Sequence, residues 1–144
     1  MSLVIDTNIL LYAANSSSER HMEAKEYVEG VRTSGELCLT WSILYEFLRV
    51  STHPKVFANP LAPQAAQSFV HALSADPRVE ILRETDNHAR FMRTIIEESA
   101  PVYGNRYHDV HIAAVMLENG VRTIATCDRH FRMFPSIRLV DRWV

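Results

Sequence analysis

The amino-acid sequence predicts an α/β protein, a three-layer α/β/α sandwich with a mainly parallel sheet. Short apolar runs alternate along the chain with longer segments whose apolar residues recur at helical spacing. This alternation is typical of strands joined by helical crossovers, which make neighbouring strands parallel. No repeat, low-complexity tract or linker interrupts it, so residues 1–144 are predicted to form a single domain.

Two apolar runs in the first half of the chain, 3–5 and 37–40, are predicted strands. Three serines followed by Glu19 predict the start of a helix, because the helix dipole favours a negative charge in the first turn. Pro63 suits another first turn, where its missing N–H needs no partner. The predicted helices of this half are 8–14, 19–31, 42–50 and 63–75, with a loop at 53–60.

The second half predicts three more strands and two helices. Asn119-Gly120 is typical of a helix end, because glycine readily adopts the left-handed conformation found there. Pro101 to Gly104 breaks the chain between the two helices. The predicted strands are 79–82, 122–125 and 137–140, and the predicted helices are 86–99 and 106–118.

The composition is that of a globular protein, because 47% of the residues are apolar and 22% are charged. Those values exclude disordered, collagen-like and cysteine-scaffold proteins. No apolar run approaches the ~20 residues of a membrane span, and 2–5 is too short for a signal-peptide core. Cys38 and Cys127 are too few for a disulfide framework, so we expect reduced thiols in a cytoplasmic protein with no membrane partner.

The charge is close to balanced, with fifteen cations, seventeen anions and a net charge of −2. This total argues against a protein that coats nucleic acid. Thirteen of the cations are arginine, and ten of these lie in 78–144. The base composition of a genome can produce such a bias, but arginine also suits bidentate contacts with phosphate.

Three of the six aspartates lie where an open α/β sheet places its chemistry. Asp6 and Asp128 each follow a predicted strand. Asp109 lies in line with the apolar stripe of helix 106–118, where an unpaired carboxylate would be costly. Glu46 lies one turn into the helix that follows the second strand, and Thr7, Asn8 and Thr126 adjoin these acids.

If the strand ends converge, these four carboxylates meet in one cleft, and their repulsion favours a bound cation or protonation. Ligands that are all oxygen suit Mg²⁺ or Mn²⁺. Such an ion can activate water and stabilise charge on phosphoryl oxygens. No lysine, serine or cysteine nucleophile stands at a familiar spacing from a base. The acids therefore predict metal-assisted hydrolysis of a phosphodiester.

Each acid also has a plain structural interpretation. Asp6 and Asp128 suit helix or turn N-caps, where aspartate is favoured. Glu46 can pair with Arg49, and Asp109 with Arg106, at the i+3 spacing of a helix surface. These alternatives do not explain why an acid lies on an apolar stripe.

The histidines and cysteines favour no rival site. His108 and His111 lie three residues apart on one helix, but no other histidine or cysteine is spaced to complete a tetrahedral zinc site. We expect both to be surface or supporting groups beside Asp109. Cys127 is predicted to act as a small buried apolar residue.

Four segments of the sequence, in order, resemble motifs of the PIN domain family and, within it, of the VapC-type toxins of bacterial toxin–antitoxin pairs. They are Val-Ile-Asp-Thr-Asn-Ile-Leu at 4–10, Ile-Leu-Tyr-Glu-Phe at 43–47, His-Asp-Val-His-Ile-Ala-Ala at 108–114 and Ala-Thr-Cys-Asp-Arg-His-Phe at 125–131. The closing segment 134–138 also resembles the short toxins. The resemblance spans almost the whole chain.

The resemblance implies a Mg²⁺- or Mn²⁺-dependent endoribonuclease with Asp6, Glu46, Asp109 and Asp128 in its catalytic site. Asp6 and Asp109 would be the metal ligands. It also implies an RNA substrate, a homodimer and inhibition by a cognate antitoxin. Many relatives have a further acid two residues after the fourth one, where this chain has His130, so a fifth carboxylate is missing. His130 could instead approach a substrate phosphate.

The mechanism expected from these residues places a metal between Asp6 and Asp109, with Glu46 and Asp128 completing the site or orienting water. Arg106 or Arg129 would hold the RNA backbone. The alternative function is a PIN-like module that binds RNA or protein without cleaving it. A haloacid dehalogenase-type phosphatase would need an aspartate at position 8, and a receiver domain would need an acid pair and a late lysine; the chain has neither.

Segment 53–75 has two interpretations. Its loop and the apolar residues of its helix could line a groove for a partner. The same stripe, which includes Ala65, Ala66, Phe69, Val70 and Leu73, could instead close the core.

Overall fold

The computed structural model describes residues 1–144 as five strands and six α-helices. The strands form one sheet in the order β3-β2-β1-β4-β5, and every neighbouring pair is parallel. This confirms the predicted fold class, with a sheet that is parallel throughout. The strands are β1 (Leu3–Ile5), β2 (Leu37–Thr40), β3 (Glu80–Leu82), β4 (Thr123–Ala125) and β5 (Arg138–Leu139). The helices are α1 (Thr7–Ala14), α2 (His21–Ser34), α3 (Trp41–Ser51), α4 (Pro63–Ser74), α5 (His88–Glu98) and α6 (Arg106–Glu118).

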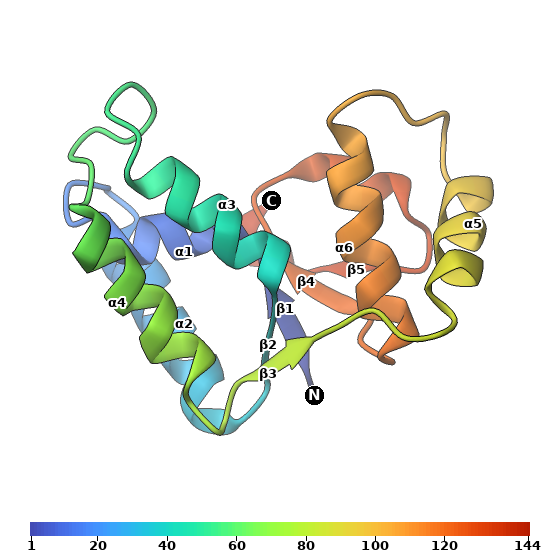
Figure 1. The fold of residues 1–144 in the computed structure, drawn as a ribbon, viewed down its shortest axis with the longest axis horizontal. Helices are drawn as coiled ribbons and strands as arrows, with labels where there is room; N and C mark the ends of the chain where they lie inside the picture. The colour runs from blue at the N-terminus through green and yellow to red at the C-terminus, as the bar shows by residue number, and fades with distance from the viewer.

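The helices form two layers on either side of the sheet (Figure 1). Helix α1 packs on α2 and α3, and α3 packs on α4, whereas α5 packs on α6. The first three strands step outward from β1 to β3, and the chain then returns across the sheet to β4. Because βαβ crossovers are almost always right-handed, this reversal sends the later helices to the opposite face.

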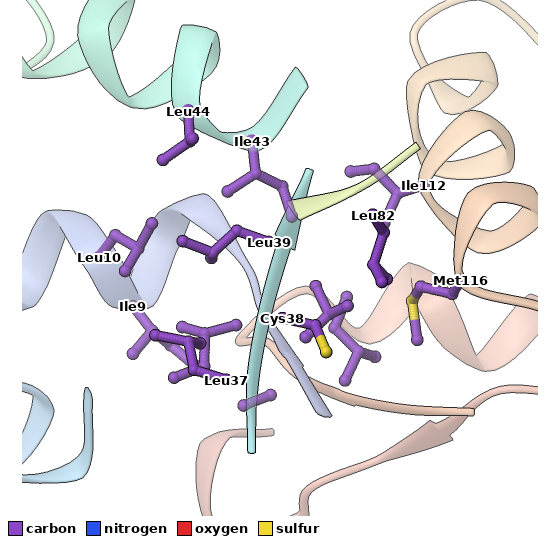
Figure 2. Close-up of a cluster of buried hydrophobic side chains, with 14 of the residues drawn as sticks. Ile9, Leu10, Leu37, Cys38, Leu39, Ile43, Leu44, Leu82, Ile112 and Met116 are labelled. Carbon is purple, nitrogen blue, oxygen red and sulfur yellow. The ribbon is translucent and has the colours of Figure 1, made fainter. Parts of the chain in front are cut away.

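The core lies on both faces of the central strands. Val4, Ile5, Leu37 and Leu39 are fully buried, as is usual for parallel strands covered on both sides. Figure 2 shows side chains from α1 and α3 on one side of β2 and those of α6 on the other. The labelled side chains of these helices are Ile9, Leu10, Ile43, Leu44, Ile112 and Met116.

The ends of several helices differ slightly from the predictions. Helix α2 begins at His21 rather than Glu19, because Ser18 Oγ accepts a hydrogen bond from the N–H of Arg20 and holds a turn there. Helix α3 begins at Trp41, and its N-cap Thr40 accepts from the N–H of Ile43. Helix α6 has the predicted bounds, and Gly120 follows it with a φ of 75°.

Two 3-10 helices near the C-terminus were not predicted. They are η1 (Arg129–Met133) and η2 (Asp141–Trp143), and β5 is correspondingly shorter than expected. Single turns of this kind are too short to produce a periodic pattern in the sequence.

The helix in segment 53–75 closes the core. Ala66, Val70 and Leu73 of α4 are buried, and the ring of Phe69 stacks on that of Phe47 with centroids 4.5 Å apart. Three of the five residues of the stripe are thus part of the core, as the second interpretation predicts, whereas Ala65 is exposed. Cys38 and Cys127 are free thiols, and none of the helices has the length and apolar character needed to cross a membrane.

Strands β1 and β4 meet at the point where the strand order reverses. Their register pairs Ile5 with Ala125, so the residues that follow, Asp6 and Thr126, leave the sheet side by side. In open α/β sheets ligands bind in the crevice at this position, beyond the carboxyl ends of the strands.

Candidate active site

Asp6 connects β1 to α1 and is the N-cap of that helix. One carboxylate oxygen accepts a hydrogen bond from the N–H of Thr7 at 2.8 Å, and the other accepts from Thr126 Oγ1 at 2.7 Å. The residue is 8% exposed. The pKa of Asp6 is raised to about 6, mainly by burial and to a smaller extent by the charges of Asp109 and Asp128, against the effect of these hydrogen bonds.

Thr126 joins three groups of the site through one fully buried hydroxyl. It donates to Asp6 and accepts from Asn8 Nδ2 at 3.1 Å and from the N–H of Asp128 at 3.0 Å. A hydroxyl has one hydrogen and two lone pairs, so its capacity is filled. Asn8 Oδ1 also accepts from the N–H of Cys127 at 3.1 Å. These bonds hold the loop after β4 against the start of α1.

Asp109 projects from the first turn of α6 and its side chain is 15% exposed. Ile112, Ala113 and Met116 of the same stripe are buried, which confirms that this carboxylate lies on an apolar face. Burial raises the pKa of Asp109, and the charge of Asp128 adds to that effect, while a hydrogen bond from Arg106 at 3.2 Å opposes it.

Asp128 is the N-cap of η1. Its Oδ1 accepts from the N–H of His130 at 2.9 Å and from His130 Nδ1 at 2.7 Å, and its Oδ2 accepts from Arg106 Nη1 at 3.1 Å. Burial acts to raise the pKa of Asp128, but the hydrogen bonds from His130 and the charge of Arg106 hold it below its usual value. Asp128 is therefore the acid with the most complete set of charged and polar partners.

Glu46 faces the site from α3. Its carboxylate pairs with Arg49, whose Nη2 lies 2.6 Å from Oε1 and whose Nε lies 3.1 Å from Oε2. Both side chains are exposed to a substantial degree. The predicted i+3 ion pair of Glu46 is thus present, and Glu46 also lines the same cleft as Asp6 and Asp109.

A cleft of about 590 Å³ brings together three of the four predicted acids, Asp6, Glu46 and Asp109. Asp128 does not line it and is connected to it through Arg106, which does. The other residues that line the cleft are Thr7, Asn8, Leu11, Ser42, Ile43, Arg49, Val50, Asn105, His108 and Ile112. Of the two arginines expected at the rim, Arg106 lies in the cleft, and Arg129 is exposed outside it.

The plain structural roles of the acids are present alongside the cleft. Asp6 and Asp128 cap helical turns, and Asp109 pairs with Arg106. A cap uses only part of a carboxylate, so it does not prevent the same group from binding a ligand. His111 pairs with Glu84 away from the acids, whereas His108 lines the cleft. Burial raises the pKa of the Cys127 thiol, which disfavours the thiolate needed for a nucleophile.

The chemistry of the acids fits a divalent cation. No group of three or more His, Cys, Asp or Glu side chains is arranged as a complete metal site in the structure. However, Asp6 and Asp109 are carboxylates with raised pKa values, and Asp6 has no cationic partner. Oxygen donors with uncompensated negative charge suit Mg²⁺ or Mn²⁺ rather than Zn²⁺. A bound cation would relieve the cost of ionising them.

The sequence placed Thr126 beside the acids, but the three hydrogen bonds of its hydroxyl and the inward position of Asn105 and Ser42 were not predicted. One feature of the sequence indicated that Thr126 belongs to the site, namely its position directly after a strand and two residues before Asp128. No such feature indicated Asn105 and Ser42, because their place in the cleft depends on how α3 and α6 approach each other.

Comparison with known proteins gives matches along almost the whole chain. The PIN domain family matches residues 3–136. Ribonuclease VapC48 of Mycobacterium tuberculosis is 33% identical over 142 residues, which cover 98% of this chain and 97% of that protein. Ribonuclease VapC43 of the same organism is 34% identical over 137 residues, which cover 94% of this chain and 92% of that protein.

Solved structures share the fold at lower identity. Mycobacterium tuberculosis VapC20, described as a sarcin-ricin loop cleaving toxin, superimposes with a TM-score of 0.62 and 20% identity over 95% of this chain and 99% of that one. DNA-bound VapBC from Salmonella typhimurium superimposes with a TM-score of 0.67 and 20% identity over 100% of this chain and 99% of that one. These matches confirm the α/β architecture and its topology.

Proposed function

The chain belongs to the PIN domain family and, within it, to the VapC ribonucleases, and from this we propose that it is a metal-dependent endoribonuclease that acts as the toxin of a toxin–antitoxin pair. One observation carries the metal dependence. Asp6 and Asp109, from opposite ends of the chain, face one cleft at the reversal of the strand order, with raised pKa values. Such a cleft concentrates negative charge where a cation and a phosphate can meet.

Each acid has a role that its position supports. Asp6 and Asp109 would hold Mg²⁺ or Mn²⁺, which supplies an activated water and stabilises charge on phosphoryl oxygens. Glu46 lies across the cleft, where it can accept a proton from the attacking water. Asp128 holds Arg106 and, through the hydroxyl of Thr126, is connected to Asp6. Attack of water on phosphorus breaks one P–O bond of the RNA backbone.

The arginines of the cleft balance its acids and suit the substrate. Arg49 and Arg106 line opposite sides, on α3 and α6. A guanidinium donates two parallel hydrogen bonds to a phosphate. A near-neutral protein can therefore bind an RNA backbone locally without coating it.

We place two protein partners beside this activity, a cognate antitoxin and a second copy of the chain. VapBC structures that share the fold contain an antitoxin with the toxin. Trp41 and Tyr45 of α3 are exposed, with ring centroids 6.5 Å apart, and this surface suits a contact between two copies. Two free thiols suit a cytoplasmic location. Light scattering of the purified chain measures the predicted dimer.

RNA cleavage by the purified chain tests the proposal. We expect cleavage with Mg²⁺ or Mn²⁺, none in EDTA, and none for Asp109→Asn. Asp86→Asn is the matched control, because Asp86 is an exposed aspartate outside the cleft. Cleavage that persists in EDTA would exclude the metal. Binding of RNA without turnover in any metal would instead favour the non-catalytic module.

A further inference from the structure

Arg106 occupies the space between two acids of the site. Its Nη1 lies 3.2 Å from Asp109 Oδ2 and 3.1 Å from Asp128 Oδ2. Its Nη2 lies 3.3 Å from His130 Nε2. One guanidinium therefore contacts one carboxylate of the cleft, one carboxylate beside it, and an imidazole.

The contacts of His130 fix its tautomer. A carboxylate can only accept, so His130 Nδ1 carries the hydrogen that is donated to Asp128 Oδ1 at 2.7 Å. A guanidinium can only donate, so His130 Nε2 accepts from Arg106. The neutral imidazole thus connects Asp128 to Arg106 and holds the guanidinium in place. A further acid at position 130 could not make both contacts in this way.

The location of Arg106 is otherwise unfavourable. It is the first residue of α6, where the helix dipole disfavours a positive charge. The ion pairs with Asp109 and Asp128 compensate for that position. A residue that contradicts a local preference, and is held by contacts from distant segments, is typical of a functional site.

The charges of the site leave a deficit that matches one divalent ion. The four acids, Asp6, Glu46, Asp109 and Asp128, carry four negative charges when ionised, and Arg49 and Arg106 supply two positive ones. The remaining charge is −2, and Asp6 is the acid without a cationic partner. A metal between Asp6 and Asp109 must therefore share or displace the guanidinium already on Asp109.

We propose that Arg106 is a built-in counter-ion that competes with the divalent metal for Asp109 and becomes available to a substrate phosphate when the metal binds. This inference rests on the proposed metal-dependent function. It makes metal affinity and RNA affinity respond in opposite directions to the loss of one side chain. A purely structural role of Arg106 would not produce that opposition.

Titration with Mn²⁺ alone, followed by electron paramagnetic resonance of the free ion, tests the proposal on the full chain. Arg106→Gln removes the competing charge, and we expect Mn²⁺ to bind about three- to tenfold more tightly, as the loss of two partly exposed ion pairs allows. Arg106→Lys keeps the charge, and Arg122→Gln removes an exposed arginine outside the cleft. Both controls should stay within about twofold of the parent chain. Circular dichroism checks that each variant is folded.

The outcomes separate this inference from the proposed function. Tighter Mn²⁺ binding by Arg106→Gln, with a higher KM for RNA, supports the inference. If Arg106→Gln binds Mn²⁺ as tightly as the parent chain or more weakly, the inference is overturned and the metal-dependent function is unaffected. The same conclusion follows if Arg106→Lys gains as much Mn²⁺ affinity as Arg106→Gln. If neither the parent chain nor Arg106→Gln binds Mn²⁺, the proposed metal site fails and the inference fails with it.

Discussion

The buried charge of Asp6 is the most direct test of the site's electrostatics, and Asp6→Asn removes it with little change in shape. Asn can still cap α1, because its carbonyl oxygen accepts from the N–H of Thr7 as the carboxylate does. The amide replaces an oxygen that accepts from Thr126, and this loss does not depend on pH. The pH-dependent part of the difference in free energy of unfolding between Asp6→Asn and the parent chain therefore measures the effect of the charge of Asp6.

The sign follows from the direction of the pKa change. The pKa of Asp6 is raised from 3.8 to about 6, mainly by burial, so the folded state holds its proton to higher pH than the unfolded state. Below pH 3.8 both states are protonated and the charge has no effect. As the pH rises to 6, only the unfolded chain ionises freely, and stability is lost. One pKa unit corresponds to about 1.4 kcal/mol, so the full loss above pH 6 is about 3 kcal/mol.

Urea denaturation between pH 4 and pH 8 in EDTA measures this effect. We expect the free energy of unfolding of Asp6→Asn to gain about 2 kcal/mol on that of the parent chain over this range, because the unfolded carboxyl is already partly ionised at pH 4. Asp86→Asn, at an exposed aspartate, should follow the parent curve. If the difference in free energy of unfolding between Asp6→Asn and the parent chain is the same at every pH, the argument that burial destabilises the ionised carboxylate of Asp6 is refuted. Mn²⁺ should restore the parent chain at pH 8 and leave Asp6→Asn unchanged.

Three further substitutions test the packing and the site. Thr126→Val should destabilise the chain by about 1–3 kcal/mol in urea denaturation, because three polar partners lose the buried hydroxyl. Thr123→Val, in the strand β4 that Thr126 follows, is the matched control, and an equal loss there would contradict the reasoning. Phe47→Ala should cost about 3–5 kcal/mol, because the ring is fully buried. Tyr103→Ala, at a side chain 77% exposed, should cost about 0.5 kcal/mol or less. Glu46→Gln should reduce RNA cleavage about a hundredfold or more if Glu46 accepts the proton of water. The free energy of unfolding should stay within about 0.5 kcal/mol of the parent value, because the ion pair of Glu46 is exposed. Cleavage at the parent rate would exclude that role.

The elements of the fold were largely predictable from local patterns. Helix α6 and strands β1 and β2 have the predicted bounds, and the ends of the other three strands differ by at most one residue. Helical and extended periodicities follow from backbone geometry and are visible in any window of the chain. The start of α2 and the two 3-10 helices were missed, because single turns held by one or two hydrogen bonds leave no periodic signal.

The acids of the candidate site were predictable from the sequence, but the contacts that connect them were not. Asp6 and Asp128 stood out because they follow strands, and Asp109 because it interrupts an apolar stripe. Their convergence depends on β1 lying next to β4, an order that local patterns do not fix. The position of Asp128 outside the cleft depends on η1 and on Arg106, and neither was visible as a constraint.

The sequence by itself determined the fold class, the four acids and the family resemblance of this protein, because each of these depends on residue types at fixed spacings along the chain. Only the tertiary structure decided that Thr126 holds Asp6, Asn8 and the loop of Asp128 together, and that Arg106 lies between Asp109 and Asp128. The contact between Thr126 and Asp6 joins residues at opposite ends of the chain. Such contacts are set by the order of strands in the sheet and by the packing of helices across it, and hydrogen bonds that depend on both have no counterpart in sequence spacing.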